Sequence, residues 1–175
     1  MDLLITPMQP EDWPAVREIY SEGIATGNAT FETEVPDWQR WDNSHRQDCR
    51  LVARAAERLN TPQGLLLGWA ALSPVSSRRV YAGVAEVSVY VAGGVRGGGV
   101  GRALLQALID ESERQGIWTL QAGIFPENVA SVKLHESLGF REVGVRHGIG
   151  KMGEVWRNVL LLERRSKAVG QLERK

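Results

Sequence analysis

A strand that ends in a run of glycines and passes directly into a leucine-rich helix is the feature that most constrains how this chain folds. Residues 91–105 read VAGGVRGGGVGRALL, with six glycines between positions 93 and 101. Glycine adopts positive φ without penalty and leaves backbone N–H groups uncovered. Because the first N–H groups of a helix have no intrahelical partner, this turn predicts a site for an anion such as a phosphate.

Two familiar phosphate loops do not fit the spacing. A nucleotide-hydrolase loop requires G-x-x-x-x-G-K-[ST], but Gly94 and Gly99 are followed by Val100 and Gly101. A dinucleotide fingerprint requires G-x-G-x-x-G, whereas Leu104 occupies the position of the third glycine. A flexible loop without a ligand remains an alternative if only the number of glycines is considered.

Strand and helix patterns alternate in the middle of the chain, and hairpins are expected toward both of its ends. Residues 80–91 are rich in β-branched side chains and predict a long strand, with Val87, Val89 and Val91 on one face and Glu86, Ser88 and Tyr90 on the other. The leucines that follow predict a helix closed by Gly116. Further strands are expected at 3–6, 50–57, 65–72, 118–124, 141–147 and 154–163, with a turn at Thr61–Gly64, and further helices at 10–26, from 37 and at 128–139. We therefore expect an α/β (α+β) fold with a mixed central sheet flanked by helices.

Length and charge limit the classes of function. The 175 residues predict one domain, residues 1–165, and a charged, loosely attached end that begins near Arg164 and forms a tail over 166–175. Lys plus Arg equals Asp plus Glu, 21 each, so no electrostatic reason points to nucleic acid or an anionic membrane. The single Cys49 excludes an internal disulfide, and no Cys and His spacing predicts a metal site. Without a leader or membrane-span pattern, a cytoplasmic protein is expected.

Two motifs in this order resemble the GNAT superfamily of acetyl-CoA-dependent N-acetyltransferases. The first is R-x-x-G-x-G at residues 96–101, and the second is N-x-x-S-x-x-L-H-x-x-x-G-F at residues 128–140. The segments AEVSVYV, NATFETEVP and LHESLGF resemble the phosphinothricin and methionine sulfoximine acetyltransferase branch. Two longer segments, GWAALSPVSSRRVYAGVAEVSVYV and EVWRNVLLLERRS, are most similar to its arsinothricin-resistance enzymes. The resemblance runs from Leu3 to about Ser166 and implies a mostly antiparallel sheet.

The resemblance implies where acetyl-CoA binds. Its pyrophosphate is expected on the N–H groups from Arg96 to Gly101, and its pantetheine arm beside the strand, where the Val89 N–H polarises the thioester carbonyl. The residues expected to contact the cofactor are Val89, Tyr90, Val91, Arg96, Gly97, Gly98, Gly99, Val100, Gly101, Arg102, Asn128, Ser131 and His135.

The expected chemistry is direct attack of a substrate amine on the thioester. A protonated amine requires a base, and Glu86 is an acid in an otherwise apolar strand, at the position that is the base in the branch. The alternative is that Glu86 lies on a solvated face in an ion pair with an arginine such as Arg79. His135 is a candidate to protonate the thiolate or to contact pantetheine, with a hydrogen-bonded packing role as the alternative.

The expected acceptor is the α-amino group of a small glutamate-like amino acid of the phosphinothricin, methionine sulfoximine or arsinothricin type. Arg78 and Arg79 are candidates for its anionic groups, with Tyr81 close by, and Phe31 and Glu32 are expected to form the opposite wall. A solvated surface turn is the alternative for the arginine pair, because Ala82 stands where several branch members carry arginine.

Two other functions remain open. The chain could acetylate another amine, such as a polyamine, an antibiotic amine or a peptide N-terminus, although the arginine pair argues against the acidic pocket of a polyamine enzyme. It could also be a non-catalytic CoA-binding module, which Glu86 argues against. By resemblance we expect a homodimer in which a late loop, residues 146–153 with His147 and Lys151, lies near the partner's active site.

Overall fold

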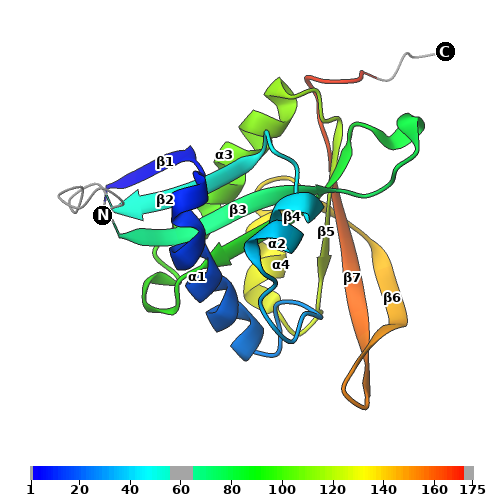
Figure 1. Cartoon of the computed structure of the whole chain (residues 1–175). Coiled ribbons are helices and arrows are strands. Elements are labelled where there is room, and N and C mark those ends of the chain that lie inside the picture. Colours follow the sequence, from blue (N-terminus) through cyan, green and yellow to red (C-terminus); the bar gives the residue numbers. More distant parts are fainter. Residues whose placement is uncertain (1, 56–64, 172–175) are drawn as a thin grey trace.

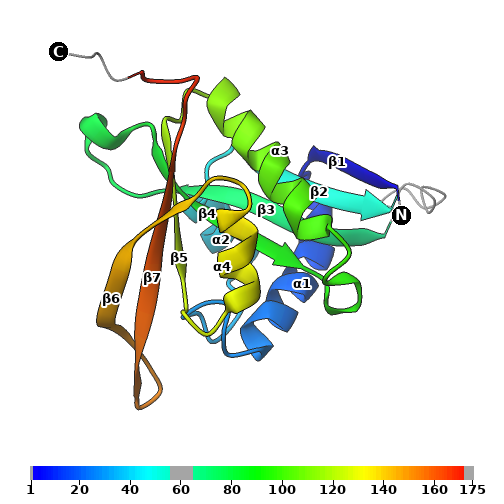
Figure 2. The ribbon, with the colours of Figure 1, turned by 180° about the vertical axis from the view of Figure 1, so that it is seen from behind.

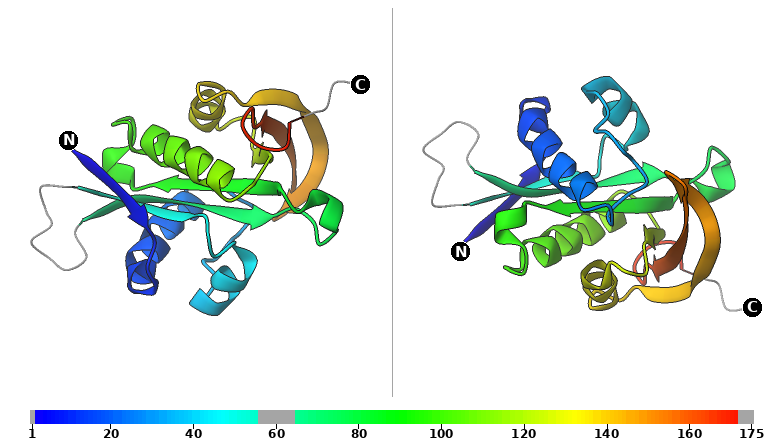
Figure 3. Two further views of the ribbon diagram at one scale, coloured as in Figure 1. Left: turned by 90° about the horizontal axis from the view of Figure 1, so that it is seen from above. Right: turned by 90° about the horizontal axis from the view of Figure 1, so that it is seen from below.

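The computed structural model describes residues 2–55 and 65–171, so the turn predicted at Thr61–Gly64 lies outside the described residues. A seven-stranded sheet in the order β1-β2-β3-β4-β5-β7-β6 carries α1 and α2 on one face and α3 and α4 on the other (Figures 1 and 3). The predicted mixed, mostly antiparallel sheet flanked by helices is confirmed. The elements are β1 (Leu3–Pro7), α1 (Trp13–Ala25), α2 (Trp38–Ser44), β2 (Arg50–Ala55), β3 (Leu66–Pro74), β4 (Val84–Val91), α3 (Val100–Arg114), β5 (Thr119–Ile124), α4 (Val129–Glu136), β6 (Arg141–Met152) and β7 (Val155–Arg165).

The parallel pair of strands, β4 and β5, separates part of the way along its length. β4 pairs with β3 as far as Val91 but with β5 only from Val84 to Glu86. Backbone groups alternate in direction along a strand. Gly83 accepts from Trp118 of the β5 side at 2.8 Å, and Ala92 donates to the β3 side at 2.9 Å. The N–H and C=O groups of the three odd-numbered valines, Val87, Val89 and Val91, therefore point into the split, beside α4 (Figure 2).

A different core covers each face of the sheet. The predicted stripe of α3, which contains Leu104, Leu105 and Leu108, is fully buried against the sheet. On the opposite face, Trp41 and Trp69 are fully buried with Tyr20 of α1, and their rings contact one another. Burying side chains of this size contributes roughly 2 to 3 kcal/mol each. The two cores fix the sheet from both sides and hold the split in β4 and β5 in place.

Two predicted elements differ from the structure. β4 begins at Val84 rather than Val80, because Arg79–Tyr81 forms a short 3-10 turn. Gly83 follows this turn and lies directly against the Trp118 ring, since a Cβ on residue 83 would come within 2.1 Å of a ring atom. The predicted late loop at residues 146–153 is wrong, because β6 continues through it to Met152. A bulge between Arg146 and Gly150 absorbs the extra residues, and the Gly148 N–H donates to Asn158 Oδ1 at 2.8 Å.

The loose attachment predicted from Arg164 onward is wrong over the described part of the chain end. The Arg165 guanidinium donates to the carbonyl of Trp118 at 2.7 Å and to that of Val169 at 2.9 Å. Ser166 is buried and donates to Glu113 of α3 at 2.9 Å. These bonds hold residues 164–170 against the end of the sheet.

Candidate active site

A cleft of about 640 Å³ lies where β4, the glycine turn, α1 and α4 meet. Gly97 and Gly99 have φ of +77° and +86°, a conformation that other residues adopt only with strain. The first helical bond of α3 runs from Ala103 N to Gly99 O, so the preceding N–H groups have no intrahelical acceptor. Gly101 allows close helix packing, since a Cβ there would lie 3.3 Å from Leu134 of α4. The turn thus presents bare donors to this cleft.

Two arginines line the same cleft. Arg96 donates from Nε to the carbonyl of Val91 at 3.2 Å, and Arg102 donates to Ser137 Oγ at 2.7 Å. Both keep guanidinium N–H groups for an anion, because a guanidinium has five. The glycines just before the motif form a short 3-10 turn, and the Gly93 N–H is held by Glu22 at 2.7 Å. We call the cleft of about 640 Å³ the glycine cleft. Its N–H donors fit a phosphate group, and the β4 edge beside it fits the amide groups of an extended ligand.

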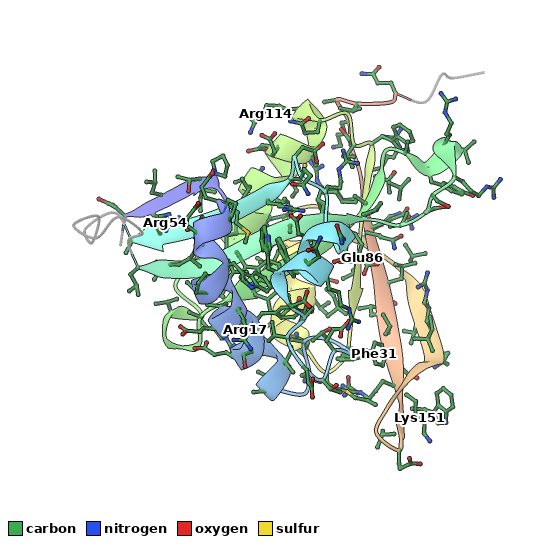
Figure 4. The ribbon with its side chains drawn as sticks, in the orientation of Figure 1. Arg17, Phe31, Arg54, Glu86, Arg114 and Lys151 are labelled. Carbon is green, nitrogen blue, oxygen red and sulfur yellow. The ribbon has the colours of Figure 1, made fainter. Side chains whose placement is uncertain are left out.

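A second cleft of about 440 Å³ lies on the other side of the split. We call it the carboxylate cleft, because Glu32 and Glu86 line it. Figure 4 shows Glu86 and Phe31 in the region between α2 and the β6–β7 hairpin, with Lys151 at the far tip of that hairpin. Residues common to the walls of both clefts are Asn28, Ala29, Val89, Tyr90, Asn128 and Ser131. The two clefts therefore meet at Val89, whose N–H points into the split.

Glu86 stands next to this junction. Its Oε2 accepts a hydrogen bond from Gln121 Nε2 of β5 at 2.9 Å. Within residues 2–55 and 65–171, no Lys, Arg or His forms an ion pair with Glu86, so the predicted alternative pair with Arg79 is not formed. The other carboxylate oxygen is left for a ligand in the cleft.

Aromatic and polar groups build the remaining walls. The Phe31 ring packs edge-on against Phe125 at 4.9 Å and lies against Gly150 of β6, where a Cβ would approach to 2.6 Å. The rings of Tyr20 and Tyr90 lie 4.8 Å apart, and burial raises the pKa of both phenols. Both hydroxyls therefore stay protonated at neutral pH and serve as hydrogen-bond donors.

The arginine that lines the carboxylate cleft is neither of the two arginines expected from the sequence. Arg78, Arg79 and Tyr81 line neither cleft: they lie in the connection between β3 and β4, which projects away from the sheet (Figure 1), and Arg78 stacks over the Tyr81 ring at 5.5 Å. Arg146 of β6 lines the cleft instead, directly opposite Val159 in the strand register. The sequence placed Arg146 only at the start of the late segment expected near a partner's active site, and the β6–β7 pairing brings it to the cleft of its own chain.

His135 is 4% exposed and lies in the wall of the carboxylate cleft. Its Nδ1 lies 2.8 Å from the carbonyl of Ser131, and because a carbonyl only accepts, Nδ1 carries the proton. Burial lowers the pKa of the ring, so it is neutral at pH 7 and Nε2 is an acceptor. This protonation state disfavours His135 as a proton donor and favours a packing and hydrogen-bonding role.

Arg157 of β7 ties together the segments around the junction. Its guanidinium donates to Gly27 O at 3.0 Å and to Asn28 Oδ1 at 2.8 Å, and it lies over the Phe125 ring at 4.0 Å. The carbonyl of Asn28 in turn accepts from Asn128 Nδ2 at 3.2 Å, while Asn128 Oδ1 caps α4. A single side chain thus fixes the loop after α1 relative to the start of α4.

Two negative findings concern the described residues only. No three His, Cys, Asp or Glu side chains in residues 2–55 and 65–171 are grouped closely enough to hold a metal ion. None of the described helices has the length and apolar character that a bilayer crossing requires.

Comparisons with known proteins agree with the geometry. The profile of the acetyltransferase (GNAT) family matches residues 13–140. A phosphinothricin N-acetyltransferase of Streptomyces coelicolor is 33% identical over 159 residues, which cover 89% of this chain and 92% of that protein. An L-methionine sulfoximine/L-methionine sulfone acetyltransferase of Salmonella typhimurium is 33% identical over 150 residues, 78% and 82% of the two chains. A phosphinothricin acetyltransferase from Sinorhizobium meliloti, solved in complex with AcCoA, superposes with a TM-score of 0.83 at 25% identity, over 99% and 95% of the chains. The resemblance to this branch is confirmed, whereas the arsinothricin resemblance stays a prediction.

Proposed function

Because the chain belongs to the acetyltransferase (GNAT) family, we propose that it transfers the acetyl group of acetyl-CoA to the α-amino group of a small glutamate-like amino acid of the phosphinothricin and methionine sulfoximine type. One observation carries the proposal: Glu86 lines a cleft that also holds a guanidinium, and this cleft meets one that is rich in backbone donors. A base close to that junction is what acetyl transfer to a protonated amine requires.

The glycine cleft fits acetyl-CoA. Its N–H groups at the start of α3, together with Arg96 and Arg102, would hold the pyrophosphate, and the β4 edge at Val89, together with the Val91 N–H, would pair with the amides of the pantetheine arm. When bound, acetyl-CoA supplies an activated thioester. The Val89 N–H, which points into the split, would donate to the thioester oxygen as negative charge develops there.

The carboxylate cleft would prepare the amine. Glu86 accepts a proton from the substrate ammonium, which frees the nitrogen lone pair for attack on the thioester carbon. The nitrogen loses its second proton as the amide bond forms and the C–S bond breaks, and the departing thiolate gains one proton. Glu86 passes the first proton to water, so each turnover releases one proton to solvent and regenerates the base. His135 does not enter this transfer in our proposal, because its one ring proton is donated to Ser131.

Arg146 would bind an anionic group of the acceptor. Within the described residues it has no ion-pair or hydrogen-bond partner, and its fork is suited to a carboxylate or phosphinate. Phe31 and Glu32 would close the side of the cleft opposite β4, as expected from the sequence, although Glu32 is directed in part toward Arg40 at 3.9 Å.

A polyamine acceptor is the second candidate, because the structure removes the argument against it. Arg78 and Arg79 lie outside the cleft, so its described lining residues include two carboxylates, Glu32 and Glu86, and one guanidinium, Arg146. The test is a thiol-release assay with acetyl-CoA against phosphinothricin, methionine sulfoximine, glutamate, other amino acids, spermidine and an aminoglycoside. We expect the highest kcat/KM with the glutamate-like acceptors, and a preference for spermidine would overturn this substrate class.

We also propose that the enzyme is a homodimer. The β6–β7 hairpin forms an edge of the sheet and exposes apolar side chains, with Trp156 64% and Val155 62% exposed. Exposed apolar clusters of this kind are typical of interfaces. Light scattering coupled to size exclusion should give twice the chain mass of 19.4 kDa, and a monomer at all concentrations would contradict the proposal.

A further inference from the structure

A row of polar side chains crosses the sheet at the level of Glu86. The strand registers place Ser73, Glu86, Gln121, Glu163 and Arg141 opposite one another on β3, β4, β5, β7 and β6. Residues that are directly opposite lie on the same face of a sheet, with neighbouring Cβ atoms roughly 5 Å apart. Gln121 therefore lies between two carboxylates, those of Glu86 and Glu163.

The two carboxylates have different partners. Glu163 forms an ion pair with Arg141 at the edge of the sheet. Glu86 has no cation and accepts instead from the Gln121 amide at 2.9 Å. Because an amide is neutral and does not titrate, it donates to a carboxylate without neutralising it. A lysine at this position would neutralise Glu86 as a base, and a carboxylate would compete with it for a proton.

The Glu86–Gln121 pair is also the last pair before β4 and β5 separate. The backbone on both sides of Gln121 is paired, to β4 on one side and to β7 on the other, so its side chain projects from a fixed point. A hydrogen bond to Oε2 fixes the rotation of the Glu86 carboxylate and leaves Oε1 available. We propose that Gln121 is the positioning residue for Glu86, which it orients toward the amine while separating it from Glu163. This inference rests on the proposed function, in which Glu86 is the base.

Other groups face Glu86 from the surrounding elements, and none replaces Gln121. Among the described residues that line the cleft, the titratable or charged ones are Tyr20 of α1, Glu32 of the following loop, Tyr90 of β4, His135 of α4 and Arg146 of β6. From β3, the opposite residue is the uncharged Ser73. Gln121 is the one described side chain with a hydrogen bond to the Glu86 carboxylate.

The test compares two substitutions at Gln121 by the pH dependence of kcat/KM. Gln121→Glu keeps the shape but adds a carboxylate, and because two adjacent carboxylates share a proton, the acid limb should move up by about one pH unit or more. Gln121→Met removes the donor and should lower kcat about tenfold without changing KM for acetyl-CoA. Tm values measured on the same samples show whether either variant is merely unfolded.

Gln106 of α3 is the matched control. It donates to the Asp110 carboxylate at 2.8 Å, outside both clefts. Gln106→Glu and Gln106→Met should leave kcat and the pH profile unchanged. If Gln121→Glu retains the wild-type pH profile, or if Gln121→Met loses activity only in proportion to folded protein, the positioning role is overturned.

The assay uses whichever acceptor of the panel the wild-type enzyme turns over fastest, so the two proposals fail separately. A preference for spermidine would overturn the substrate class and still test Gln121 by its pH profile. Normal turnover of a glutamate-like acceptor with an unchanged pH profile in Gln121→Glu would overturn only the role of Gln121. No turnover with any acceptor would overturn both.

Discussion

The two clefts are built from different parts of the chain. The glycine cleft depends mainly on main-chain groups: the N–H donors of Gly97, Gly99, Gly101 and Arg102, and the edge of β4 beyond its pairing with β5. The carboxylate cleft depends on side chains that come from α1, β4, β5 and β6. Backbone donors suit a part of the ligand that is the same in every turnover. Side chains can be replaced by substitution, so a site built from them can be adapted to a different acceptor. The comparison predicts that substitutions in each cleft affect the kinetics of a different substrate.

The largest effect should come from the carboxylate cleft. Glu86→Gln keeps the size of the side chain but removes the base, and general-base catalysis is worth about 10²- to 10⁴-fold. We expect kcat/KM at pH 7 to fall by that factor while KM for acetyl-CoA stays unchanged, measured by thiol release. Glu154→Gln is the control, since that side chain is 94% exposed at the hairpin tip. Wild-type kcat/KM in Glu86→Gln would refute the assignment.

A backbone change should affect the glycine cleft. Gly99 has φ of +86°, so Gly99→Ala introduces roughly 1 to 2 kcal/mol of strain in the turn. We expect KM for acetyl-CoA to rise about tenfold, with little change in KM for the acceptor. Gly94→Ala is the matched control, because a Cβ there meets nothing within 4 Å and φ is not positive. Equal effects of the two substitutions would mean that the turn conformation is unimportant.

A smaller effect is expected at the cation of the carboxylate cleft. Arg146→Gln removes an exposed charge, worth about 1 kcal/mol or roughly fivefold in KM for an anionic acceptor. KM for acetyl-CoA should not change. Arg79→Gln should leave both values unchanged, because Arg79 lines neither cleft. If Arg79→Gln raised KM for the acceptor and Arg146→Gln did not, Arg79 would belong to the substrate site. A partner chain or a loop movement would then have to bring it there.

The smallest effect concerns His135, which stands beside the junction. Burial lowers the pKa of its ring, so below the ordinary value of about 6.5 the unfolded chain binds a proton that the folded chain does not. Its contribution to the free energy of unfolding is complete above that pH and is lost as the pH falls. His45, whose pKa is lowered by burial as well, adds to the same trend.

His135→Gln should therefore lose less stability than the wild type between pH 7.5 and 5.5, as measured by urea unfolding. Glutamine can still donate to Ser131 O, and kcat should stay within about threefold of wild type because His135 donates no proton to substrate. A loss of kcat comparable to that of Glu86→Gln would instead make His135 a proton donor.

The difference between the clefts also explains what could be predicted from the sequence. The glycine cleft comes mainly from two motifs, each an unbroken stretch of sequence, at 96–101 and 128–140. The positive φ expected of glycines in the turn is present at Gly97 and Gly99. The order of strands and helices followed from local patterns for the same reason. Glu86 was recognisable because an acid interrupts an apolar strand.

The wall of the carboxylate cleft was not predictable in the same way. Arg146 reaches it through the pairing of β6 with β7, and Gln121 reaches Glu86 through the pairing of β5 with β4, and the sequence singled out neither residue for these positions. Arg79 was a candidate because its guanidinium suits an anionic group and the segment leads into the Glu86 strand, but a 3-10 turn and Gly83 direct that segment away. The bulge in β6 was missed because the strand was expected to end at residue 147 and the resemblance implied a loop over residues 146–153, whereas the paired strand bends and continues to Met152.

Arg157 has a consequence for the mechanical precision of the enzyme. Its guanidinium is planar and rigid, and it holds the loop after α1, the Phe125 ring and, through Asn28 and Asn128, the start of α4. The loop after α1 and the start of α4, which both border the junction of the two clefts, are therefore joined by one stiff group. Since a misplacement of about 1 Å can cost a hundredfold in rate, that stiffness would keep the two substrates of the proposed reaction aligned from one turnover to the next.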